Sequence, residues 1–243
     1  MKLPSRIRGL VVAALCGTGC ATVVPMQPAS VLAEGETRVA AQLSVAPWCG
    51  VGGGLAQGCA YNPGGTPLPD ARVGVRRGFG SGLEAGVSAH ATGFAPPGTG
   101  FEPALRGGLW LEGKKEVWSR EVGPGQRQVL SVGPGLGVDL VSVRPMGLHA
   151  FAPEVLLGLP VYFGHQTEGF EWVVRAAFLE RLAEPSLALD GRPPRLDVGE
   201  LELSVALLRR PPGHWGVSLG YRAPTGQLAG GAFSLGFGWS FGL

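Results

Sequence analysis

The sequence 232-AFSLGFGWSFGL-243, at the end of the chain, carries the clearest structural pattern. Every second residue is large and apolar: Phe233, Leu235, Phe237, Trp239, Phe241 and Leu243. The residues between them are only glycine and serine. Because strand side chains alternate between two faces, all the large apolar groups lie on one side of such a strand. An amphipathic helix would instead space them three and four residues apart. The stretch is therefore predicted to be a β-strand with one apolar face and one nearly bare face.

A final strand of alternating aromatic residues resembles the last strand of bacterial outer-membrane β-barrels. In that family the strand is an assembly signal, which usually ends in an aromatic residue. Here the last residue is Leu243, in phase with Phe241. The resemblance implies that the barrel assembly machinery is a partner and that the signal comprises Phe237, Trp239, Phe241 and Leu243. The alternative is an edge strand of a soluble β-protein.

The same alternation, punctuated by glycine and proline, repeats along the chain from residue 36. The predicted strands number about ten, and each is close to the 9–11 residues that a tilted membrane strand needs. They are Glu36–Ala46, Ala71–Phe79, Leu83–Thr92, Phe101–Glu112, Arg127–Ser142, Leu148–Phe163, Phe170–Leu179, Val198–Leu208, Trp215–Arg222 and Ala232–Leu243. The stretch Trp172–Glu180 also fits a short helix. We expect an all-β, antiparallel, up-and-down transmembrane β-barrel over residues 36–243. The alternatives are eight strands or a soluble lipocalin-like barrel.

The charged residues of these strands fall in phase with the small residues. This pattern predicts a charge network in the barrel lumen, composed of Arg38, Arg72, Arg76, Glu84, Glu102, Arg106, Glu112, Asp139, Glu154, Arg175, Glu200, Glu202 and Arg222. Arg77 is out of phase and lies at a strand end, where a long side chain can reach the interface. A barrel of about ten strands is narrow, so we expect paired charges to close it.

Alternation alone does not say which face is inside, but three features favour a membrane barrel over a soluble one. The polar face is rich in glycine, serine and alanine, which suits a crowded lumen. Lysine, a common solubilising residue, occurs only at Lys2, Lys114 and Lys115. Aromatic residues cluster toward strand ends, as in the girdles of membrane barrels. Outer-membrane lipid is therefore an expected partner.

The N-terminus has the pattern of an export signal, predicted over residues 1–19. Basic residues precede the short apolar run Leu10–Leu15, which is too short to span a bilayer as a helix. The following sequence, Gly17-Thr18-Gly19-Cys20, resembles the lipobox of bacterial lipoproteins, with Gly17 where that family usually has a larger apolar residue. The resemblance implies that Cys20 is acylated and that residues 20–35 form a lipidated tether. Plain signal-peptide cleavage nearby is the alternative.

Two further cysteines, Cys49 and Cys59, lie in a glycine- and proline-rich segment. An exported protein meets an oxidising compartment, so a disulfide between them is expected. Metal binding needs more ligands than this pair offers.

Several function classes lack support in the sequence. The 20 basic residues leave 17 against 18 acidic ones once Lys2, Arg6 and Arg8 are removed with the signal. No basic patch indicates nucleic-acid binding. The sequence His90-Ala91-Thr92 resembles the His-x-Ser of barrel lipid A deacylases, but threonine replaces serine and no acid partner is evident. We predict no catalytic residues, no metal and no cofactor.

The sequence thus predicts a lipid-anchored barrel in the bacterial outer membrane, with both termini in the periplasm. The expected outward loops are 47–69, 93–100, 143–147, 181–197 and 224–230, and the periplasmic connections lie at Gly80, 113–125, 164–169 and 209–213. The expected role is structural or interactive, exerted through the outward loops, with a closed lumen. The alternatives are a narrow pore for small solutes and a soluble-type lipid-binding barrel held by the anchor.

Overall fold

The computed structural model describes residues 26–49, 69–94, 104–143, 150–183, 199–210, 214–225 and 232–242. These residues form a sheet of antiparallel strands. The strands are β1 (Thr37–Cys49), β2 (Pro69–Gly80), β3 (Leu83–Phe94), β4 (Ala104–Gly123), β5 (Gln126–Val132), β6 (Gly135–Val143), β7 (Ala150–Gln166), β8 (Phe170–Ala183), β9 (Glu200–Arg209), β10 (His214–Pro224) and β11 (Ala232–Gly242). Among the described residues, no helix is long and apolar enough to cross a membrane.

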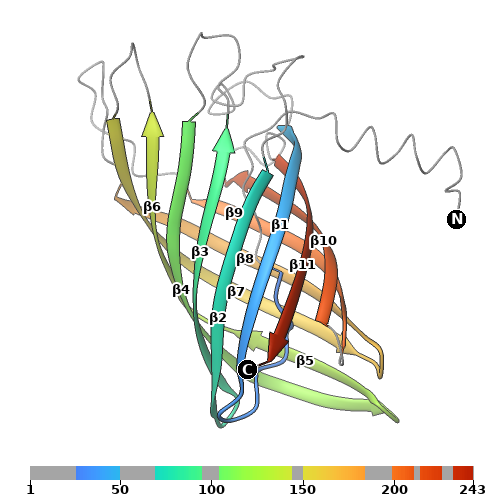
Figure 1. Cartoon of the computed structure of the whole chain (residues 1–243). Coiled ribbons are helices and arrows are strands. Elements are labelled where there is room, and N and C mark those ends of the chain that lie inside the picture. The colour runs from blue at the N-terminus through green and yellow to red at the C-terminus, as the bar shows by residue number, and fades with distance from the viewer. Residues whose placement is uncertain are drawn as a thin grey trace, which may run out of the picture.

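The sheet closes on itself as a barrel, because β1 pairs with both β2 and β11 (Figure 1). The short strands β5 and β6 both lie between β4 and β7. Together they occupy one strand position, so the barrel has ten strand positions. The predicted antiparallel ten-stranded barrel is confirmed, and the eight-stranded alternative is wrong.

The interruption between β5 and β6 coincides with Gly133 and Pro134. Proline has no backbone N–H, so it cannot donate a hydrogen bond to a neighbouring strand. The carbonyl of Pro134 accepts a bond from Gly113 N at 2.9 Å, and Gly133 N donates to Pro160 O at 3.1 Å. The predicted strand Arg127–Ser142 therefore keeps its place in the barrel but is divided in two.

The long connection predicted over residues 113–125 is wrong, because these residues form a β-hairpin. Strand β4 continues to Gly123, and β5 begins at Gln126 after a tight turn in which Gly125 has a φ of 68°. Beyond Lys115, which pairs with Leu83, β4 pairs only with β5. Residues 116–122 of β4 therefore form a hairpin with β5 that extends past the neighbouring strand β3. The segment Trp172–Glu180 lies within β8 and is a strand, not a helix.

The two ends of the barrel differ in the length of their connections. Residues 81–82, 124–125, 167–169 and 210–213 join strands at one end, which we call the short-turn end. The connections at the other end span 50–68, 95–103, 144–149, 184–199 and 225–231. Strand β1 begins and β11 ends at the short-turn end, as Figure 1 shows.

The two faces of the barrel wall have the reverse of a soluble protein's polarity. The outward side chains are large and apolar and are 37–58% exposed, among them Leu109, Leu159 and Val217. The inward side chains include buried charged residues such as Glu84, Arg175 and Glu202, each exposed by 3% or less. Soluble monomers rarely expose apolar patches larger than a few hundred Å². This inversion is the pattern of a barrel that turns its apolar face to lipid.

A lumenal segment and a charge network as the candidate functional site

The barrel lumen contains a segment of the chain itself, Met26–Gly35, which we call the lumenal segment. It runs toward the short-turn end, visible as the dark blue trace inside the barrel in Figure 1. There the chain reverses into β1 through a turn in which Glu36 N donates to Ala33 O at 3.0 Å. Gly35 has a φ of 78°, which glycine adopts without steric cost. Gly78 permits the approach, because a Cβ there would lie 2.5 Å from Leu32 O.

Side chains of the barrel wall hold the backbone of the lumenal segment. Glu171 Oε1 accepts from Ala29 N at 2.8 Å, and Glu84 Oε2 accepts from Leu32 N at 3.0 Å. Lys114 Nζ donates to Pro28 O at 3.0 Å, and Ser131 Oγ donates to Ala29 O at 2.6 Å. Near the segment's start, Met26 N donates to Gln42 Oε1 at 2.8 Å. Buried backbone groups must be paired, and here the wall's charged and polar side chains supply the partners.

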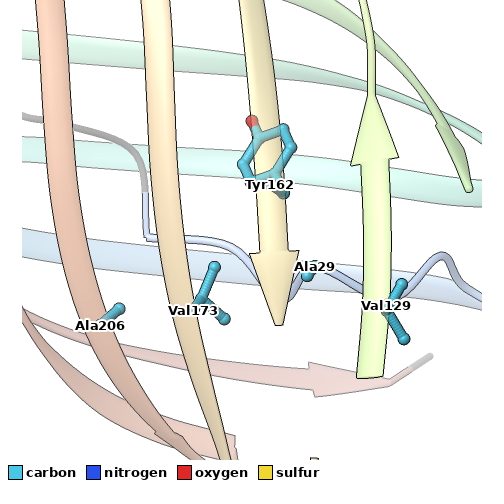
Figure 2. Close-up of a cluster of buried hydrophobic side chains, with 5 residues drawn as sticks. All are labelled: Ala29, Val129, Tyr162, Val173 and Ala206. Carbon is cyan, nitrogen blue, oxygen red and sulfur yellow. The ribbon is translucent and has the colours of Figure 1, made fainter. Parts of the chain in front are cut away.

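An apolar cluster fixes the middle of the lumenal segment. Figure 2 shows Ala29 beside side chains from four strands: Val129 of β5, Tyr162 of β7, Val173 of β8 and Ala206 of β9. Ala29, Val129 and Tyr162 are fully buried. The segment is thus packed into the wall as well as hydrogen-bonded to it.

One group of buried charges lies where the lumenal segment approaches the short-turn end. Glu84 contacts Arg76 Nη1 at 3.0 Å and Lys114 Nζ at 3.1 Å. Its other oxygen accepts the bond from the backbone of Leu32. A buried carboxylate without such partners would be strongly destabilising. Glu84 therefore joins two wall strands and the lumenal segment through a single side chain.

A second group crosses the lumen around Tyr162. Its hydroxyl donates to Glu112 Oε1, and Arg175 Nε lies 3.4 Å from the same hydroxyl. Arg175 Nη1 contacts Glu202 Oε2 at 2.6 Å. The charges of Lys114 and Arg175 lie 5.4 and 5.6 Å from the Tyr162 ring centroid, within cation–π range. Arg222 extends the group by pairing with Glu200 and with Glu202.

Most predicted lumenal charges whose side chains are described point inward and are paired. Arg38 contacts Glu36, and Asp139 lies 3.3 Å from His90 Nε2, an acid partner that sequence spacing did not reveal. Arg72 also points inward. Arg77 is exposed on the outer face.

Some predicted residues fall outside the described part of the chain. They are Cys20, Cys59, Glu102 and Leu243, together with the side chains of Cys49, Arg106 and Glu154. Phe237, Trp239 and Phe241 lie on the outer face of β11, 43–48% exposed. Their role in assembly stays a prediction, as do lipidation at Cys20 and the disulfide.

Four residues that organise the lumen were absent from the predicted network: Trp110, Lys114, Tyr162 and Glu171. Lys114 was missed because the predicted strand ended at Glu112, whereas β4 continues through it. Glu171 lies within the predicted strand Phe170–Leu179 and is in phase with Val173 and Arg175, so the alternation alone would have placed it on the inward face. Trp110 and Tyr162 are large and partly apolar, and were not expected on the polar face. Their polar atoms bind Glu112.

The fold and site define a closed antiparallel β-barrel with an apolar exterior and a charged lumen occupied by its own chain. No family model and no curated protein matches the sequence. Among solved structures, neisserial surface protein A is similar, with 10% identity, a TM-score of 0.39, and coverage of 85% of this chain and 96% of that one. The β domain of the Bordetella autotransporter BrkA has 13% identity and a TM-score of 0.45, with 86% and 100% covered. The outer-membrane protease OmpT from Escherichia coli has 11% identity and a TM-score of 0.36, with 86% and 92% covered.

Proposed function

We propose that this chain is an integral outer-membrane β-barrel whose lumen is closed, and that it has a structural or interaction role exerted through its outward loops. The observation that carries the proposal is the lumenal segment, held by wall side chains and packed against Tyr162 and Val129. Catalysis is not part of the proposal.

The asymmetry of the barrel supports an orientation. Outer-membrane barrels have short periplasmic turns and longer extracellular loops. The short-turn end therefore faces the periplasm in this proposal, and both ends of the barrel domain lie there. Aromatic side chains also gather on the outer face at this end: Phe79, Phe163, Phe170, Trp172, Trp215 and Phe241. Such a girdle matches a membrane interface.

The two alternative functions fit the lumen less well. A lipid carrier needs an apolar interior, whereas the described inward residues include buried Glu84, Lys114, Asp139 and Arg175. A narrow pore needs a continuous aqueous path, and at ten strands the bore is already tight. The lumenal segment and the ion pairs around Tyr162 occupy part of that bore. We therefore favour the closed barrel over both.

Conductance in planar bilayers tests closure. The unmodified protein should show no steady channels. Glu171→Ala removes the acceptor for Ala29 N and contacts to Ser30 and Gln166, and so should loosen the lumenal segment and produce openings. Deleting residues 26–35 should produce larger openings. Heat-modifiable gel mobility verifies that each variant is folded.

Glu168→Ala is the matched control for this experiment. Glu168 lies in the exposed turn between β7 and β8 and carries the same charge as Glu171. It should leave conductance at the unmodified level. Steady ohmic channels from the unmodified protein would reject closure and establish the pore. If the deletion variant also shows no conductance, the lumenal segment is not what closes the lumen.

The proposal includes a lipid anchor at Cys20. Met26 lies beside Gln42, five residues into β1 from Thr37, or about 17 Å along the strand. The six residues from Cys20 to Met26 span about 20 Å when extended. The tether is therefore just long enough to reach the periplasmic mouth.

Cys20→Ser should abolish incorporation of radioactive palmitate, and the variant should stay membrane-bound through its barrel. Labelling that persists in this variant would exclude Cys20 as the anchor.

A further inference from the structure

A cavity of about 170 Å³ lies in the lumen beside the lumenal segment. Residues of β1, β2, β3, β4 and β8–β11 line it, together with Met26, Gln27, Pro28 and Ser30 of the lumenal segment. One water molecule requires roughly 10–15 Å³ measured in this way. The cavity is therefore large enough for a small organic or inorganic ion with part of its hydration shell.

The charges that line this cavity are mainly positive. Five arginines contribute to it, Arg38, Arg72, Arg76, Arg209 and Arg210, against two carboxylates, Glu112 and Glu171. Both carboxylates already accept hydrogen bonds: Glu112 from Trp110, Tyr162 and Gln27, and Glu171 from the lumenal segment. Arginines thus outnumber carboxylates in the lining; of the five, Arg209 is exposed and Arg210 Nη1 donates to Thr167 O at 2.9 Å. We call it the arginine cavity.

Two of its arginines are neutralised by neighbours. Arg38 and Arg76 are direct cross-strand partners on β1 and β2, an arrangement that is destabilising for like charges. Each has its own carboxylate, Glu36 for Arg38 and Glu84 for Arg76. The two arginines are tolerated side by side because each forms an ion pair with its own carboxylate.

Arg72 differs from both. Its cross-strand partners are Gln42 on β1 and His90 on β3, neither of which is an acid. The buried Nε and Nη1 atoms of Arg72 have no hydrogen-bond partner among the described residues. A buried guanidinium has five donors and no acceptor, so unmet donors are costly.

The acids that act electrostatically on Arg72 do not satisfy these two donors. They are Glu112, Glu202 and, more weakly, Asp70. Glu112 is bound by Tyr162, Trp110 and Gln27, and Glu202 is bound by Arg175 and Arg222. Asp70 also has an interaction of its own. Arg72 Nε and Nη1 thus have no acceptor among the described residues, and Arg72 is one of the residues that line the cavity.

We propose that the arginine cavity binds one small oxyanion, phosphate or carboxylate, with Arg72 as its principal donor. Such an ion supplies the paired oxygens that a guanidinium fork binds best. It also offsets the excess positive charge of the cavity. The lumenal segment lines one side of this site. Calorimetry measures anion binding directly, so the result is distinguishable from the conductance test of closure.

Isothermal titration calorimetry on the full folded chain in detergent tests the site. Sodium phosphate and sodium succinate are titrated separately at a fixed sodium chloride concentration. We expect saturable binding of at least one of them, with one ion per chain. Arg72→Gln should weaken that binding by about tenfold or more, because a charge-assisted pair is lost. Binding of phosphate alone or succinate alone identifies the anion class.

Arg77→Gln is the matched control, because Arg77 is the adjacent residue of β2 and points out of the barrel. It should bind like the unmodified chain. If Arg72→Gln does not fold, Arg72→Lys keeps the charge without the fork and should show binding weakened to a smaller extent. The proposal is overturned if neither anion binds saturably, if the Arg72 variants bind as tightly as the unmodified chain, or if Arg77→Gln loses binding equally.

Discussion

Trp110 shows how the small residues of the lumen are used. Its indole lies inside the barrel and donates from Nε1 to Glu112 at 3.2 Å. It packs over glycines of β6 and β7. A Cβ at Gly135 would lie 2.7 Å from Trp110 Cε2, and one at Gly158 would lie 2.8 Å from Cη2. The glycines therefore create the flat surface on which one large side chain lies, and Leu156 and Leu179 complete the cluster.

Gly137→Ala tests this packing. The added Cβ would lie 2.6 Å from Trp110 Cζ3, so the indole must move in a crowded lumen. Overpacking of this kind costs about 1–3 kcal/mol. Denaturant unfolding of the detergent-solubilised barrel, monitored by tryptophan fluorescence, should show a free energy of unfolding that is lower by this amount. Gly113→Ala is the control, because its Cβ meets only Pro134 at 3.8 Å. Equal stability of the two variants would contradict the proposed role of the glycine surface.

At the scale of elements, the strands were predictable and their ends were not. Period-two alternation located the barrel strands, because the two faces of a barrel wall meet different environments along the whole strand. The β4–β5 hairpin was missed because residues 116–122 lie beyond the barrel and do not alternate: Val117 and Trp118 are adjacent, and both are exposed. Its exposed charged residues, such as Arg120 and Glu121, are typical of edge strands that avoid aggregation.

The lumenal segment could not be predicted from local pattern. Residues 26–35 have no strand period, and Pro28 opposes regular structure, so an extended tether was the natural expectation. Their partners, Glu84, Lys114, Ser131 and Glu171, lie far along the chain. Local periodicity contains no information about such distant pairs. The arginine cavity was unpredictable for the same reason, although Arg72 was correctly placed on the inward face.

In the whole molecule, the barrel wall separates a polar interior from an apolar exterior, and neither face of the wall suits the environment of the other. Most charged groups inside pair with one another or with the lumenal segment, while leucine, valine and aromatic side chains face outward. In water the outer face would expose a continuous apolar band, which soluble proteins avoid. In a bilayer the same band is stabilised, and the closed sheet leaves no unpaired edge within the hydrocarbon.

Strand β10 offers a direct test of this arrangement. Leu219 is 51% exposed on the outer face, whereas its neighbour Ser218 points inward toward Gly236. In a background with Cys49→Ser and Cys59→Ser, a bilayer-confined thiol probe should label Leu219→Cys. It should leave Ser218→Cys unmodified, because the wall separates that position from lipid. Val217→Arg should lower the free energy of unfolding of the barrel from the bilayer by about 2–4 kcal/mol, the value for an arginine that faces lipid near the midplane. Labelling of Ser218→Cys without labelling of Leu219→Cys would mean that the apolar face is not in contact with lipid.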